Sequence, residues 1–251
     1  AQNCGVPILF AERGPFPCSV FLAGVPIGPE MKFTKALDET LIAQPNEARD
    51  QGALDGLIAR YLKHDQSAWE QPPREEEAVL RKRWGIPEDY RIIFCAAQRP
   101  ADANMLLHSP HFSSNGAFIR HIISAMRGLP KTALVIKPHP KESTSSDQEI
   151  MDAVEMARQL GVMAVCDRTV NIKDAIEVST VVASINSTTG LEALLHGVQV
   201  VVGGESYYSH QGFTFDVQCS DDAAEIARLH DYIKNPQYSS SQQEKGKRGG
   251  A

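Results

Sequence analysis

The sequence predicts an α/β protein built on a parallel sheet, and three observations carry this prediction. Between residues 85 and 235, short apolar segments typical of strands alternate with segments of helical spacing. The strand segments are apolar along their whole length, as expected for strands covered on both faces. The 251 residues, 42% of them hydrophobic, correspond to about 1.7 domains of ~150 residues, so one large or two modest domains are expected.

The N-terminal third is expected to contain a buried strand, a long segment rich in Pro and Gly, a helix, a linker and a charged helix, at residues 6–11, 15–33, 48–64, 66–74 and 75–84. The strands expected after it are residues 91–97, 132–137, 162–166, 181–185 and 198–202. The helices expected between and after these strands are residues 117–126, 147–160, 189–196 and 221–234, and residues 98–115 are expected to form a polar loop.

Composition and charge exclude several classes of protein. The apolar content is unlike that of a disordered chain, a collagen-like repeat or a coiled coil. A formal net charge of −6 argues against a dedicated nucleic-acid binder, which needs a basic face. No apolar run approaches the ~18 residues of a membrane span, and the N-terminus does not read as a signal peptide. Five scattered cysteines without a CxxC pair indicate a reduced, cytoplasmic protein without a zinc site.

Two expected strand ends carry groups suited to a phosphate, since ligands of doubly wound sheets bind beyond the carboxyl ends of the strands. One end continues as Lys137-Pro138-His139-Pro140, in which the prolines hold both donors in an extended geometry. A turn with solvated side chains is the alternative. The other end runs into the hydroxyl cluster Ser184 to Thr189, which opens a helix and predicts an anion site.

Simple N-capping by Ser187 or Thr188 accounts for one hydroxyl of that cluster and not for the rest. Glu192, one turn into the same helix, is a candidate acceptor from ribose hydroxyls. A favourable interaction of its carboxylate with the helix dipole is the alternative.

The other two strand ends offer carboxylates. Asp102, which follows Gln98 and Arg99, is a candidate nucleophile or base. A turn or cap residue is the alternative. Glu12 and Arg13 are a candidate acid/base and its charge partner, with a structural ion pair as the alternative.

Several motifs of nucleotide and metal enzymes are missing from the chain, namely GxGxxG, GxxxxGK[ST], HExxH and DxD. An enzyme without a metal must neutralise a leaving group with Lys, His, Arg and helix N-termini. This set of groups favours a monophosphate leaving group over a diphosphate.

Four stretches together resemble the bacterial capsule polysaccharide biosynthesis proteins, the retaining β-Kdo transferases and their relatives. These stretches are Leu9 to Pro17, Gln98 to Asp102 with Leu107 to Pro110, Lys137 to Pro140, and Ser184 to Gly212. The resemblance implies two Rossmann-like halves of the GT-B type, with the active site in the cleft between them. It also implies CMP-Kdo as donor, no metal cofactor, and retention of configuration by double displacement.

The resemblance implies roles by matching position. Asp102 matches the nucleophile and Glu12 the acid/base, while His139 acts with Lys137 on the departing CMP. Arg13 or Arg99 is expected to hold the sugar carboxylate. The donor-binding residues implied in full are Arg13, Gln98, Arg99, Lys137, Ser187, Thr188, Glu192, Tyr207 and His210, of which the last two have no specific role assigned.

Family members have further strand–helix units before the Glu12 loop. The resemblance therefore implies an incomplete N-terminal half over residues 1–85, a nucleotide-sugar-binding half over residues 86–235 and a disordered tail over residues 236–251. The partners it implies are the CMP-sugar donor, a glycan or lipid-linked acceptor and other domains of a multi-domain synthase. The expected location is cytoplasmic, and peripheral association with the inner membrane stays open.

Two other functions stay open from the sequence. One is another metal-independent transferase of nucleotide sugars or CDP-alcohols, such as a sialyltransferase-like enzyme, which also uses a His-Pro strand end and a Ser/Thr cluster. The other is a non-catalytic carbohydrate- or nucleotide-binding domain.

Overall fold

A computed structural model describes residues 10–13, 20–23, 70–140, 144–220 and 222–235, and helical positions at 52, 56, 58, 59, 61 and 62. The chain divides into two compact units, Ala1–Glu70 and Gln71–Ala251. The helical positions fall inside the helix expected over residues 48–64. The tail expected over residues 236–251 and most of the segment 15–33 lie outside the described residues.

The first unit contains an antiparallel hairpin. Strand β1 (Phe10–Arg13) pairs with β2 (Val20–Ala23), so that Glu12 lies opposite Phe21. The sequence prediction ended this strand at Ala11 and put Glu12 and Arg13 in a loop, and that boundary is wrong. Pairing with a strand inside the segment expected to be irregular extends β1 by two residues.

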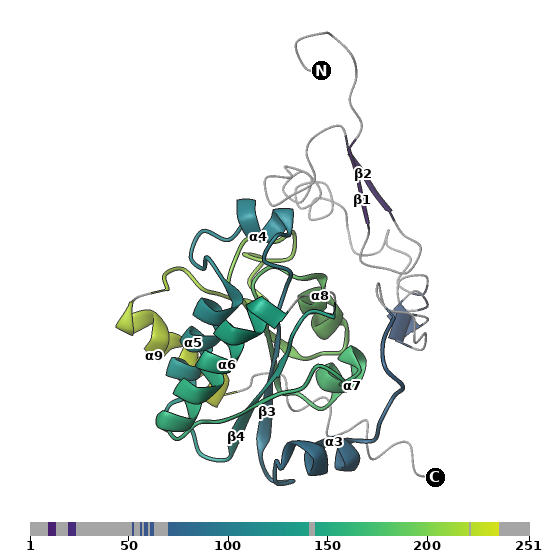
Figure 1. Cartoon of the computed structure of the whole chain (residues 1–251). Coiled ribbons are helices and arrows are strands. Elements are labelled where there is room, and N and C mark those ends of the chain that lie inside the picture. The colour runs from purple at the N-terminus through teal and green to yellow at the C-terminus, as the bar shows by residue number, and fades with distance from the viewer. Residues whose placement is uncertain are drawn as a thin grey trace. The chain divides into compact units, whose positions relative to one another are not determined.

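The second unit is built on a six-stranded parallel sheet with helices on both faces (Figure 1). Its strands are β3 (Arg91–Ala96), β4 (Thr132–Lys137), β5 (Met163–Cys166), β6 (Val181–Ser184), β7 (Gln199–Val202) and β8 (Phe215–Asp216). Its helices are α3 (Glu77–Trp84), α4 (Ala103–Leu107), α5 (Asn115–Met126), α6 (Thr144–Gln159), α7 (Ile172–Glu177), α8 (Thr188–Leu195) and α9 (Ala223–Lys234). The strand order is β5-β4-β3-β6-β7-β8.

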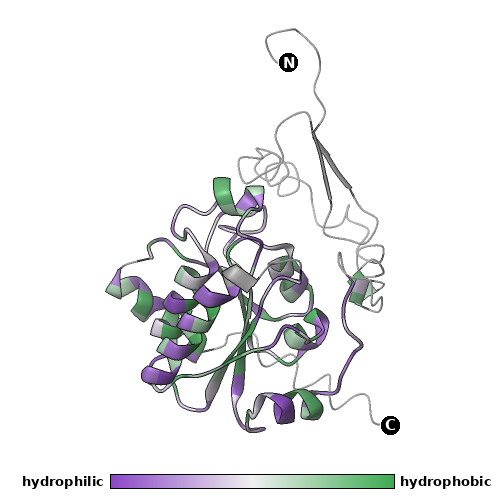
Figure 2. Ribbon diagram, viewed as in Figure 1, coloured by the Kyte–Doolittle hydropathy of each residue, from purple (hydrophilic) through white to green (hydrophobic). Residues whose placement is uncertain are grey.

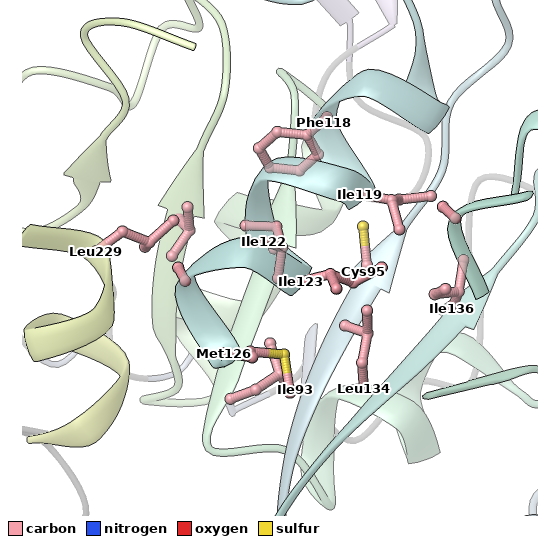
Figure 3. Close-up of a cluster of buried hydrophobic side chains, with 14 of the residues drawn as sticks. Ile93, Cys95, Phe118, Ile119, Ile122, Ile123, Met126, Leu134, Ile136 and Leu229 are labelled. Carbon is pink, nitrogen blue, oxygen red and sulfur yellow. The ribbon is translucent and has the colours of Figure 1, made fainter. Parts of the chain in front are cut away.

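Alternating side chains of each strand build two apolar layers, one on each face of the sheet. In β3, Ile93 and Cys95 face the layer made with α5, α6 and α9, while Ile92 and Phe94 face the layer made with α3, α7 and α8. Figure 3 shows α5 residues such as Phe118 and Ile122 over the first layer. Because both faces are covered, the central strands are mostly hydrophobic between their ends, as Figure 2 shows.

The α/β class and the alternation of strands and helices are confirmed. In the second unit, three elements were missed, namely α4, α7 and β8. They contain five, six and two residues, too few for either hydrophobic period to be visible in the sequence. Their positions depend on contacts with parts of the chain far away in the sequence.

The segment before α3 is tied to α7. The backbone N–H of Glu75 donates to Asp174 Oδ2 at 2.8 Å, and Asn171 Nδ2 donates to the Pro72 carbonyl at 2.7 Å. Leu80 and Trp84 of α3 pack into the core of the second unit. The core of this unit therefore includes residues before residue 86.

We predict that Phe118→Ala lowers the free energy of unfolding by about 3–5 kcal/mol, because it leaves a cavity in the layer between α5 and the sheet. Urea unfolding followed by circular dichroism measures the change. Leu106→Ala, at an exposed position of α4, is the control and is expected to change it by less than about 0.5 kcal/mol. Equal effects of the two substitutions would contradict the assignment of the core.

Candidate functional site

The carboxyl ends of the parallel strands meet at one edge of the sheet. The chain runs outward through β3, β4 and β5, then returns to place β6 on the other side of β3. The sheet therefore has a switch point between β3 and β6, which is where ligands bind in open α/β sheets. Two of the polar stretches singled out in the sequence, those around Asp102 and Ser187, follow these two strands.

Three buried amide side chains join the loops at this switch point. Gln98 Oε1 accepts from the backbone N–H of Asn186 at 2.8 Å, and Gln98 Nε2 donates to Asn186 Oδ1 at 2.8 Å. On the other side, the backbone of Gln98 exchanges two hydrogen bonds with the Asn115 side chain, at 2.9 and 2.7 Å. Gln98, predicted to bind the donor, therefore links the loops after β3 and β6 through both atoms of its amide.

Asp102 lies at the start of α4. Its Oδ1 accepts from the backbone N–H of Asn104 at 2.9 Å, so the residue is the N-cap of this helix. This is the structural role that the sequence left open as an alternative. The capping bond uses only Oδ1, so the second oxygen of this half-buried carboxylate can still take part in a reaction.

Ser187 is the N-cap of α8, on the other side of the switch point. Its Oγ accepts from the backbone N–H of Thr189 at 3.2 Å and donates to Thr189 Oγ1 at 3.0 Å. Thr188 is exposed at the first helical position, whereas Glu192 is buried one turn further along. Within the hydroxyl cluster, Ser187 therefore caps the helix, Thr188 faces solvent, and Ser184 and Thr189 are buried.

Sequence reasoning missed Tyr208, which packs on the first turn of α8. Its hydroxyl donates to the Ser187 carbonyl, and a Cβ on Gly190 would lie 2.7 Å from Cζ of its ring. Burial raises the pKa of Tyr208 to about 12, so it stays a donor at neutral pH. The ring of Tyr207 meets it edge to face at 5.4 Å, and burial also raises the pKa of Tyr207. No local pattern in the sequence predicts this close contact between Gly190 and the ring of Tyr208.

Lys137 is turned into the protein. Only 4% of it is exposed, and Nζ donates to the carbonyls of Arg168 at 3.0 Å and Val170 at 2.7 Å. Burial lowers the pKa of its ammonium group, which the nearby Asp167 carboxylate opposes. Two of the three N–H groups of this ammonium therefore stabilise the loop after β5. These two bonds leave the third N–H group for a ligand.

The remaining predicted residues are spread around this edge. His139 is half-buried and accepts from Arg168 through its carbonyl at 3.1 Å. Arg99 is exposed just after β3. His210 is exposed in a left-handed conformation, with φ of 60°, and its N–H donates to Asp216 Oδ2 at 3.0 Å.

Glu12 and Arg13 belong to the first unit, and their side chains lie outside the described residues. Within the described part of the chain, no group of three or more His, Cys, Asp or Glu side chains could hold a metal ion. None of its helices has the length and apolar character needed to cross a membrane.

The fold and this edge define a Rossmann-like α/β domain with a polar site at the switch point of its sheet. The family model of the capsule polysaccharide biosynthesis proteins matches residues 49–235, well over half of the chain. The protein therefore belongs to that family, and the resemblance drawn from its motifs is confirmed.

Two solved structures share the fold. The β-Kdo 2,4 transferase of Thermosulfurimonas dismutans KpsC matches with a TM-score of 0.57 and 17% identity, covering 92% of this chain and 73% of that one. The β-Kdo 2,7 transferase of the same protein matches with a TM-score of 0.55 and 21% identity, covering 91% and 69%. Protein FixF of Sinorhizobium fredii is 33% identical over 123 residues, which are 48% of this chain and 28% of FixF. The match thus spans little more than a quarter of that curated relative.

We predict that Lys137→Met lowers the free energy of unfolding by about 1–3 kcal/mol without any ligand, because one buried and one partly buried carbonyl lose their donor. Chemical denaturation measures the change. Arg99→Met, at an exposed position after β3, is the control and should stay within about 0.5 kcal/mol of the wild type. Unchanged stability of Lys137→Met would show that this ammonium is not committed to the loop.

Proposed function

We propose that the protein is a retaining glycosyltransferase that moves Kdo from CMP-β-Kdo to a glycan or glycolipid acceptor in capsule or lipopolysaccharide assembly. The observation that carries the proposal is the placement of Asp102 and the N-terminus of α8 on the two sides of one switch point, in a member of the capsule polysaccharide family. The solved structures that share the fold and are named as β-Kdo transferases support it.

The proposed reaction has two displacements at the anomeric carbon of Kdo. Asp102 attacks this carbon, and the bond to the CMP oxygen breaks with its electron pair leaving on the phosphate. The acceptor hydroxyl then attacks from the opposite face, passing its proton to Glu12 and releasing Asp102 as a carboxylate. A carboxylate beside an oxocarbenium-like centre stabilises it or traps it, as in retaining glycosidases.

The leaving CMP needs its negative charge balanced without a metal in this proposal. The N-terminus of α8, with Ser187 and Thr188, offers hydrogen-bond donors and the positive end of a helix dipole. His139 and the remaining N–H of Lys137 would add charge from the end of β4, which lies on the other side of β3. Glu192 would accept from the ribose. Arg99 or Arg13 would hold the Kdo carboxylate. Tyr207 and His210 would complete the donor side.

The acceptor side and the setting of the reaction belong to the proposal as well. A glycan or a lipid-linked starter is the proposed acceptor, and the proposed site of action is the cytoplasmic face of the inner membrane. Other domains of a multi-domain synthase are the proposed partners.

We predict that Asp102→Asn abolishes turnover of CMP-Kdo while CMP affinity stays within about twofold, because the substitution removes the nucleophile and keeps an N-cap. Turnover assays and calorimetry measure the two quantities. Asp222→Asn is a matched control, since Asp222 caps α9 with the same 2.9 Å bond to a backbone N–H. A sugar adduct of Kdo mass on the Asp102 peptide would support the proposal, and normal turnover by Asp102→Asn would refute it.

We also predict that CMP raises the melting temperature more than CDP or UDP does. Ligand at about 100 times its Kd stabilises a folded protein by ~2.7 kcal/mol, which is a shift of several degrees. A thermal-shift titration measures the difference. Stabilisation by CDP or UDP without stabilisation by CMP would instead indicate a transferase with another donor, and binding without any turnover would indicate a non-catalytic domain.

A further inference from the structure

The buried side chain of Asn186 connects the loop before α8 with both ends of α4. Its Nδ2 donates to the Asn104 carbonyl at 2.9 Å and to the His108 carbonyl at 3.1 Å. Its Oδ1 accepts from Gln98 Nε2 at 2.8 Å. Only 7% of Asn186 is exposed. Its bond with Gln98 is buried, and its two bonds to the carbonyls at α4 are partly buried.

Apolar packing contributes little to holding helix α4. Five residues are far fewer than the ~12 that an isolated helix needs to be even marginally stable. Two of them, Leu106 and Leu107, are 71% and 74% exposed, whereas Met105 is buried. The position of this helix therefore depends on polar contacts more than on apolar burial.

The loop after β7 also contacts the C-terminal end of α4. The backbone N–H of Glu205 donates to the His108 carbonyl at 2.8 Å, and the N–H of Gly204 donates to the Ile185 carbonyl at 2.8 Å. A Cβ on Gly204 would lie 2.7 Å from the His108 carbonyl oxygen. The loops after β6 and β7 thus both donate to the His108 carbonyl, which belongs to the loop after β3.

We propose that Asn186 is a positioning residue that sets the separation between Asp102 and the N-terminus of α8. Asn186 directly precedes Ser187, the cap of α8, while its side chain holds the helix that Asp102 caps. Asn186 therefore links the proposed nucleophile directly to the proposed phosphate site. This inference rests on the proposed function, in which these two groups act on the same donor.

The test is Asn186→Asp, which keeps the shape of the side chain and an acceptor for Gln98 but turns a carboxylate oxygen toward two carbonyls. Loss of these two partly buried hydrogen bonds should raise hydrogen exchange of the α4 amides ~10–100-fold. Displacement of a reacting group by about 1 Å should lower kcat about 10²-fold. The affinity for CMP, measured by calorimetry, should stay within about twofold, because α8 keeps its cap.

Asn171→Asp is the matched control. Asn171 is 5% exposed, its Oδ1 accepts from the Lys173 N–H at 3.0 Å, and its Nδ2 donates to the Pro72 carbonyl at 2.7 Å. The same substitution there should destabilise the segment before α3 without changing exchange in α4 or kcat. An equal fall in kcat for both variants would mean general destabilisation and would overturn the inference.

A second variant covers the case in which Asn186→Asp does not fold. Gly204→Ala places a methyl group against the His108 carbonyl and should raise exchange in α4 and lower kcat in the same way. Wild-type exchange in α4, or wild-type kcat, in either folded variant would overturn the inference. Absence of turnover in the wild type would refute the proposed function instead, and exchange in α4 would then decide whether Asn186 holds this helix.

Discussion

Three amide side chains, Gln98, Asn115 and Asn186, are buried where the sheet reverses its strand order, and each is hydrogen-bonded to a defined backbone group. A buried amide without its partner costs about 1–3 kcal/mol, so the loops after β3 and β6 have one favourable arrangement. Because the two candidate groups for chemistry cap helices that start in these loops, the geometry of the site depends on this network. The apolar layers on the two faces of the sheet stabilise the fold without specifying that arrangement.

Glycines allow the third loop to join the same assembly. Gly203 lies against Phe118 of α5, Gly204 against the carbonyl of His108, and Gly190 against the ring of Tyr208. At each position a Cβ would come closer than side chains tolerate. Loops that follow three different strands are therefore packed into one body. The proposed transfer would need such rigidity to hold its two reacting groups at a fixed distance.

Lys137 illustrates the difference between what a residue can do and where the fold puts it. Its position beside His139 at a strand end suggests a phosphate ligand, since both side chains can donate to an anion. In the structure, two of the three N–H groups of its ammonium donate to carbonyls of the loop that follows β5. The choice between these roles depends on a loop thirty residues away, which no local pattern reveals.

The sequence by itself determined the α/β class, the boundaries of β4 and most of those of α5, α8 and β7, because their apolar periods are complete within a few residues. It also identified the strand ends at which polar residues gather. The tertiary structure alone decided the hairpin of β1 with β2, the short elements α4, α7 and β8, and the partners of Gln98, Lys137 and Tyr208. These features depend on pairing between distant segments, and a hydrogen bond between distant residues leaves no periodic trace in the chain.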